Sequence, residues 1–119
     1  MINKNKIGEK GEIKAREFLI NKNYTILSSN WRYQHKEIDL IAQKDNTLVI
    51  VEVKTRTSNY ISPKESVRKK KQQNLIIAAN AYVQINNLDI DVRFDIIEVI
   101  IQNKEYTVNH IKEAFYPLL

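Results

Sequence analysis

Two short apolar segments joined by a tight turn constrain the fold more than any other feature of the sequence. Residues 37–43 and 48–56 are rich in β-branched and aliphatic side chains at alternating positions. Asp45 and Asn46 stand between them, and both residue types tolerate a positive φ. The pattern predicts a β-hairpin with a two-residue loop, and therefore a fold that is built on at least one antiparallel strand pair.

Four charged side chains interrupt this apolar hairpin. Because side chains alternate along a strand, Glu37 and Asp39 share one face, and Glu52 shares a face with Lys54 and Arg56. The two-residue loop places Asp39 opposite Glu52 and Glu37 opposite Lys54. Two facing carboxylates repel each other, and a cation bound between Asp39 and Glu52 would remove that repulsion. The alternative is a solvated strand face with a Glu37–Lys54 salt bridge.

The composition restricts which cation this could be. The chain has no cysteine and only 2 histidines, which excludes a disulfide scaffold, a cysteine-based zinc site and a thiol nucleophile. Carboxylate oxygens favour a hard ion, and we expect Mg²⁺ or Mn²⁺. Glu12, Glu9 and Glu17 are candidates for a third carboxylate. Glu12 follows Gly11 inside a predicted helix, where a glycine suggests a close backbone approach.

The remaining pattern predicts one α/β domain over residues 1–119, with a mixed sheet of about five strands flanked by helices. A helix over 4–22 ends at Asn23, and a second helix begins with a capping box at Ser62, Pro63 and Glu65 and runs to about Val83. Strands are predicted over 24–33, 37–43, 48–56, 91–101 and 106–111, followed by a short helical turn before Pro117. The order is α-β-β-β-α-β-β.

Charge is distributed unevenly along the chain. The net charge is +5; residues 1–75 hold 16 basic and 8 acidic residues, and residues 76–119 hold 3 and 6. The run Arg68-Lys69-Lys70-Lys71, with Lys64 one turn earlier, suits a polyanion such as nucleic acid or an anionic surface, although a solvated helix face is the plainer interpretation. We see no signal peptide and no membrane span, and we expect a cytoplasmic protein.

The motifs resemble one family over nearly the whole chain. These are Gly8-Glu-Lys-Gly11-Glu12, Asn30-Trp-Arg32, Glu37-Ile-Asp39, Val51-Glu52-Val53-Lys54-Thr-Arg56 and Arg93-Phe94-Asp95. The set resembles the YraN-like family of small bacterial proteins, which is similar to the restriction-endonuclease-like superfamily with PD-(D/E)xK sites, and nearest to archaeal Holliday-junction resolvases. Lys36 departs from the family pattern, which usually has glycine there.

The resemblance implies a restriction-endonuclease-like core with the metal ligands at Asp39 and Glu52, completed by Glu12. It makes Lys54 the catalytic lysine, while Glu37 belongs to the signature of the family. The expected function is Mg²⁺- or Mn²⁺-dependent hydrolysis of DNA, with branched or recombination intermediates among the candidate substrates. Contacts to the nucleic-acid backbone are expected from Arg56, Lys64, Arg68, Lys69, Lys70 and Lys71.

Two other functions fit the same sequence. One is a nucleic-acid-binding module with a nuclease-like fold and no cleavage activity. The other is an adaptor whose basic helix docks on an acidic protein partner. Turnover with a divalent metal separates the enzyme from both. A homodimer is compatible with the sequence.

Overall fold

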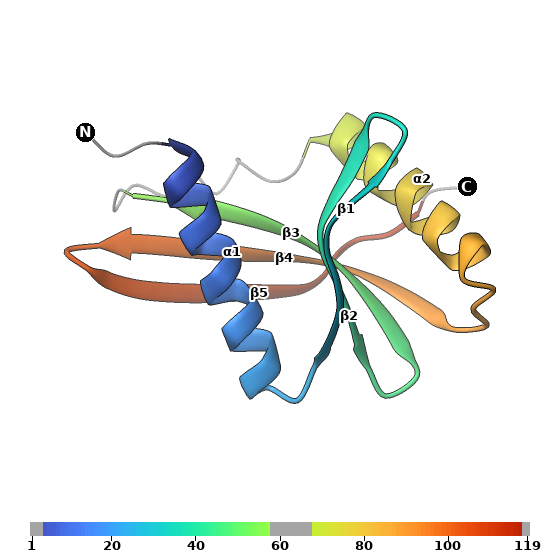
Figure 1. Cartoon of the computed structure of the whole chain (residues 1–119), viewed down its shortest axis with the longest axis horizontal. Coiled ribbons are helices and arrows are strands. Elements are labelled where there is room, and N and C mark those ends of the chain that lie inside the picture. The colour runs from blue at the N-terminus through green and yellow to red at the C-terminus, as the bar shows by residue number, and fades with distance from the viewer. Residues whose placement is uncertain (1–3, 58–67, 118–119) are drawn as a thin grey trace.

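The computed structural model describes residues 4–57 and 68–117, and it confirms the predicted order of elements. The chain forms a five-stranded sheet with two helices (Figure 1). The elements are α1 (Lys4–Asn21), β1 (Thr25–Tyr33), β2 (Lys36–Lys44), β3 (Thr47–Arg56), α2 (Lys69–Ile85), β4 (Asp91–Gln102) and β5 (Glu105–Phe115).

The strands lie in sequence order across the sheet, β1-β2-β3-β4-β5. Neighbours are antiparallel except for β3 and β4, which run parallel from the pair Thr47–Asp91 to the pair Arg56–Ile100. A parallel pair needs a long crossover connection, and α2 lies within this one. The sheet is therefore mixed, as the sequence predicts, and its central strand β3 carries Glu52, Lys54 and Arg56.

Each helix covers its own apolar cluster. Ala15 and Leu19 of α1 pack with a cluster that includes Val49. Leu75 of α2 packs with the other cluster, which includes Ile50. Because Val49 and Ile50 are consecutive in β3, the two clusters lie on opposite faces of the sheet. The fold thus has three layers, with the sheet in the middle.

Three of the predicted turns and helix ends are confirmed at residues with a positive φ. Asn23 ends α1 with φ 69, and the following N–H, that of Tyr24, donates to the carbonyl of Leu19 at 2.9 Å. Asp45, in the β2–β3 loop, has φ 52, and the residues of the β4–β5 turn, 103 and 104, have φ 49 and 67. Asparagine and aspartate accept this conformation better than most residues, so these ends were readable from sequence.

Two element boundaries were predicted wrongly. Helix α2 begins at Lys69 after an extended Arg68, whose side chain makes no capping hydrogen bond. The capping residues expected at 62–65 lie outside the described residues. At the C-terminal end, β5 continues to Phe115 in place of the expected helical turn. Phe115 pairs with Phe94 of β4, and their rings stack with centroids 5.1 Å apart, so packing on the neighbouring strand overrides the local preference.

Candidate metal and nucleic-acid site

The β2–β3 hairpin has the predicted register, but its ladder is shorter than predicted. Lys44 pairs with Thr47 and Leu40 with Val51, as a two-residue loop requires. The ladder stops there. At the next position the Asp39 carboxylate accepts a hydrogen bond of 2.8 Å from the backbone N–H of Val53. A side chain thus takes the place of a backbone partner, and Asp39 is fixed against β3 at the point where the two strands separate.

Glu37 lies beyond this point, and its partner is not the predicted one. It pairs with Arg32 of β1 in the sheet, and the two side chains form an ion pair of 3.5 Å. Lys54 is paired with Glu98 of β4. The expected pairing of Glu37 with Lys54 is therefore wrong, because β2 has left β3 before reaching it. Arg32 and Glu37 support the β1–β2 edge.

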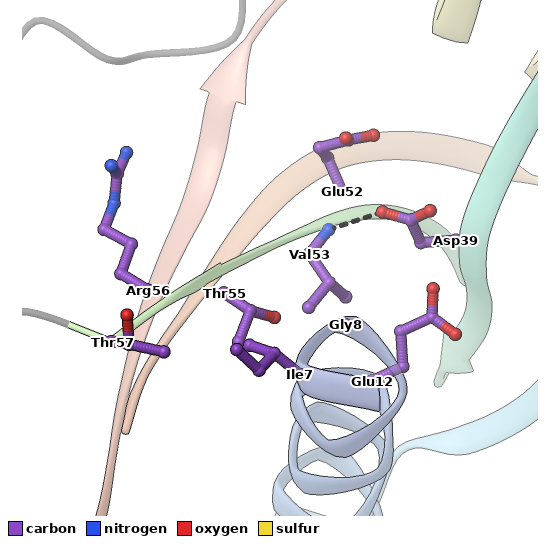
Figure 2. Close-up of a pocket in the computed structure, with 9 residues that line it drawn as sticks. All are labelled: Ile7, Gly8, Glu12, Asp39, Glu52, Val53, Thr55, Arg56 and Thr57. Atoms are coloured by element: carbon purple, nitrogen blue, oxygen red, sulfur yellow. Dashed lines mark hydrogen bonds between the residues drawn. The ribbon is translucent and has the colours of Figure 1, made fainter. Parts of the chain in front are cut away.

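Three carboxylates from three elements line one pocket. It has a volume of about 500 Å³ and is open to solvent. Figure 2 shows Asp39 of β2 between Glu52 of β3 and Glu12 of α1. The other lining residues are Ile7, Gly8, Val53, Thr55, Arg56 and Thr57. The three acidic residues expected to share a metal therefore border the same cavity.

Gly11 explains how α1 brings Glu12 to this pocket. A Cβ atom at Gly11 would overlap Oγ1 of Thr55 and come within 2.9 Å of the Thr55 Cβ. Only a residue without a side chain lets the helix backbone lie this close to β3. The close approach inferred from the glycine is confirmed, and it seats Glu12 at the rim of the pocket.

Burial and nearby negative charges raise the pKa of both central carboxylates, Asp39 and Glu52. Burial is the largest cause that raises the pKa of Asp39, to about 6, with Glu12 and Glu37 adding to it against the Val53 hydrogen bond and Lys71. Burial also raises the pKa of Glu52, to about 7, and the charge of Asp39 raises it further. A cation close to the carboxylates of Asp39 and Glu52 would offset both the loss of hydration and the repulsion between negative charges.

One such cation is a residue whose role sequence reasoning missed. Nζ of Lys71, in the first turn of α2, lies 3.8 Å from Oε1 of Glu52. The other oxygen, Oε2 of Glu52, is buried and has no hydrogen-bond partner among the described residues. Nothing in the sequence connects Lys71 to Glu52, because the contact depends on where α2 begins and on how it packs against the sheet.

The other predicted site residues lie on β3 or at the start of α2, apart from Lys64. Lys54 follows Glu52 by two positions and lowers the pKa of Glu52 by its charge, although it does not line the pocket. Arg56 does line it, and its Nε lies 3.9 Å from Oε2 of Glu98. Arg68, Lys69 and Lys70 are exposed at the start of α2, and Lys64 lies outside the described residues.

The donor set fits a hard divalent ion that keeps some of its water. In the part of the chain that the structure describes, no group of three or more histidine, cysteine, aspartate or glutamate side chains is arranged to hold a metal ion. Mg²⁺ does not need one, since it is commonly held by one or two carboxylates, waters and substrate phosphates. Asp39 and Glu52 would supply the two carboxylates, and Oε2 of Glu52, which has no hydrogen-bond partner among the described residues, would be available as a ligand atom.

A second polar cluster lies apart from the pocket and serves the fold. Asp95 is fully buried and accepts hydrogen bonds from Arg93, at 2.8 and 2.9 Å, and from the N–H of Glu113, at 3.1 Å. His110 Nε2 lies 2.7 Å from Asp95, and Arg93 also donates to the hydroxyl of Tyr24 at 2.7 Å. Burial alone would raise the pKa of Asp95, but His110 and Arg93 hold it below its usual value. The cluster ties β4 to β5 and to Tyr24 in the connection between α1 and β1.

Among the described residues, no helix is long and apolar enough to cross a membrane.

Similarity to known proteins covers most of the chain. Residues 11–99 match the model of "Uncharacterised protein family UPF0102".

Relatives described as UPF0102 proteins match almost end to end. The one from Flavobacterium psychrophilum is 50% identical over 98% of either chain. The one from Bacteroides thetaiotaomicron is 45% identical over 100% of this chain and 99% of the relative. The one from Parabacteroides distasonis is 41% identical over 98% and 97%. The chain therefore belongs to the UPF0102 (YraN) family, as its sequence motifs predicted.

Proposed function

We propose that this protein is a divalent-metal-dependent nuclease that hydrolyses phosphodiester bonds in DNA, with a PD-(D/E)xK-type site. One observation carries the proposal. Asp39 and Glu52 line the same solvent-open pocket, and burial raises the pKa of both, with added repulsion from Glu12 and Glu37 at Asp39 and from Asp39 at Glu52. A fold that keeps two carboxylates together at such a cost is well suited to a cation.

In this proposal Asp39 and Glu52 hold Mg²⁺ or Mn²⁺, and Glu12 contributes directly or through a water. An ion held there would supply Lewis-acid chemistry, lowering the pKa of a coordinated water and neutralising charge on the scissile phosphate. The Val53 N–H orients the Asp39 carboxylate and leaves its other oxygen for the ion. Lys54, close enough to Glu52 to lower its pKa, orients the attacking water or stabilises charge on the phosphate.

The surroundings of the pocket support a polyanionic substrate. The ion pair between Lys71 and Glu52 places the first turn of α2 beside the acidic site. Arg68, Lys69 and Lys70 extend from that turn into solvent. A nucleic-acid backbone held by these side chains would pass the mouth of the pocket, where a phosphate could reach the metal.

A cleavage assay tests the proposal. The wild-type protein is incubated with labelled linear, flapped and four-way DNA, and with RNA, in Mg²⁺, in Mn²⁺ and in EDTA. We expect cleavage of at least one DNA substrate, with metal only. Asp39→Asn should abolish it, since the asparagine keeps the Val53 hydrogen bond but loses the charge. Lys54→Ala should reduce turnover by at least ~10²-fold and leave DNA binding largely intact.

Asp89→Asn is the matched control, because Asp89 is an exposed carboxylate outside the pocket. It should cleave as wild type does. If wild type cleaves none of these substrates but binds DNA, the binding-module alternative replaces the enzyme. If it neither cleaves nor binds nucleic acid, the adaptor alternative takes its place.

A further inference from the structure

We propose that Lys71 is a tethered cation that neutralises Glu52 until a divalent ion in the acidic pocket displaces it, and that the displaced lysine then binds a substrate phosphate. The inference rests on the proposed function, because it assigns regulation to the same site. It makes metal binding and polyanion binding mutually reinforcing.

The first support is the asymmetry of the ion pair. The Glu52 side chain is 8% exposed and fixed in the sheet, whereas the Lys71 side chain is 42% exposed at the start of a helix. Their separation of 3.8 Å is longer than a hydrogen bond. Glu52 cannot leave the pocket, but Lys71 can swing into solvent without disturbing the core.

The second support is the unused ligand capacity of Glu52. Its Oε2 atom is buried without a hydrogen-bond partner among the described residues, although Lys71 lies near Oε1. A lysine at this distance thus neutralises part of the charge and leaves one oxygen unsatisfied. A divalent ion bound through Oε2 would satisfy the carboxylate more fully, and its positive charge would repel the Lys71 ammonium from the neighbouring Oε1.

The third support is that the local sequence opposes a purely structural role. Helix α2 begins with Lys69, Lys70 and Lys71, has no acidic residue in its first turn, and lacks a side-chain cap. Cations at a helix N-terminus are unfavourable because of the helix dipole. The three lysines therefore destabilise the start of α2, and a nearby anion would stabilise it. We assign that role to Glu52 before the metal binds and to a substrate phosphate afterwards.

The coupling follows from competition. Metal at Glu52 releases Lys71, so the polyanion gains a cationic contact. A polyanion that draws Lys71 away leaves Glu52 open to metal. By linkage the two effects have the same size. Mn²⁺ should therefore bind more tightly when DNA is present, and this gain should be smaller when Lys71 loses its charge.

Calorimetric titration of the full chain with Mn²⁺, without DNA, tests the competition. We expect Lys71→Met to bind Mn²⁺ at least ~5-fold more tightly than wild type, the lower end of typical coupling between sites. Lys70→Met removes the same charge from the preceding residue, whose side chain is exposed, and this variant should bind Mn²⁺ as wild type does. Lys71→Arg keeps the charge and should stay close to wild type.

A second titration adds a short duplex DNA with uncleavable phosphorothioate linkages. Wild type should gain Mn²⁺ affinity, and Lys71→Met should gain less. Equal Mn²⁺ affinity for Lys71→Met and Lys70→Met, or no Mn²⁺ binding by any variant, overturns the inference. If Lys71→Met binds Mn²⁺ more tightly, shows the reduced gain with DNA, and wild type still cleaves no substrate, the competition stands and the proposed nuclease function fails.

Discussion

Burial sets the chemistry of Asp39 and Glu52 more strongly than their charged neighbours do. Desolvation is the largest cause of the raised pKa in both residues, and repulsion within the pocket comes after it. The two acidic positions could be predicted from sequence, because a charge that interrupts an apolar strand is visible in the alternation. The contact of Lys71 with Glu52 could not, because it depends on how α2 docks on the sheet.

The raised pKa values predict a pH dependence of stability in the absence of metal. The pKa rises from 3.8 to about 6 for Asp39 and from 4.5 to about 7 for Glu52. Between these values the folded state binds more protons than the unfolded state, so stability falls as the pH rises from about 4 to about 7. Asp39→Asn should weaken this decline and be more stable than wild type at pH 8.

Thermal unfolding in EDTA at pH 5 and pH 8 measures this effect. The exposed-site variant Asp89→Asn serves as the control and should follow wild type at both pH values. An Asp39→Asn protein whose melting temperature falls between pH 5 and pH 8 as steeply as that of wild type would show that the pocket does not hold Asp39 in an unfavourable environment.

At the scale of elements, the hairpin and α1 illustrate what local sequence determines. The β2–β3 register follows from a two-residue loop that accepts positive φ, and the end of α1 follows from Asn23. The point at which β2 leaves β3 was not predictable, because a hydrogen bond from the backbone N–H of Val53 to the Asp39 carboxylate replaces the ladder there. The start of α2 was predicted wrongly. The capping-box pattern at Ser62 predicted one helix from there to about Val83, but Arg68 is extended and α2 begins at Lys69.

The two glycines of α1 give a matched test of how this helix lies on the sheet. A Cβ at Gly11 would overlap Thr55 of β3, whereas a Cβ at Gly8 meets nothing within 4 Å. We expect Gly11→Ala to destabilise the fold by about 1–3 kcal/mol, the usual range for overpacking. Gly8→Ala should stabilise it by up to about 1 kcal/mol, because alanine favours helix.

Urea unfolding of both variants measures the difference in the free energy of unfolding. Gly11→Ala should also weaken Mn²⁺ binding, since it displaces the helix that carries Glu12, while an exposed change on the same helix, Glu9→Gln, should not. Equal stability of the two glycine variants would mean that α1 does not lie as close to β3 as described.

At the scale of the whole molecule, the charges divide between a solvent-open acidic pocket and the exposed basic residues at the start of α2. Helix α1 and strands β2 and β3 together supply the acidic side chains of the pocket. The basic side chains come from the start of α2, which contacts the pocket through Lys71 and Glu52. The sequence predicted both halves but assigned Lys71 to the basic half alone. Its position against Glu52 makes it the link between them.

The exposed lysines of this helix start should control DNA affinity without affecting the fold. Replacing Lys69 and Lys70 together with alanine should weaken binding about equally for all sequences. It should reduce the slope of log affinity against log salt by up to about 2, close to one per lost phosphate contact. Stability should change by no more than about 0.5 kcal/mol, as is usual for surface positions.

Fluorescence anisotropy with one duplex at several salt concentrations gives this slope. The control removes two exposed lysines elsewhere, Lys22 and Lys112, and should leave the slope close to that of wild type. A slope that is the same for both double variants would assign the basic run to something other than DNA.

The central claim is that Asp39 and Glu52 share one divalent ion. Anomalous diffraction from crystals soaked in Mn²⁺ tests it most directly, because the signal locates the ion without reference to activity. We predict one strong peak in contact with carboxylate oxygens of both residues, with the Lys71 side chain moved away from Glu52. A soaked crystal with no peak between these carboxylates, and with Lys71 still beside Glu52, would contradict the claim.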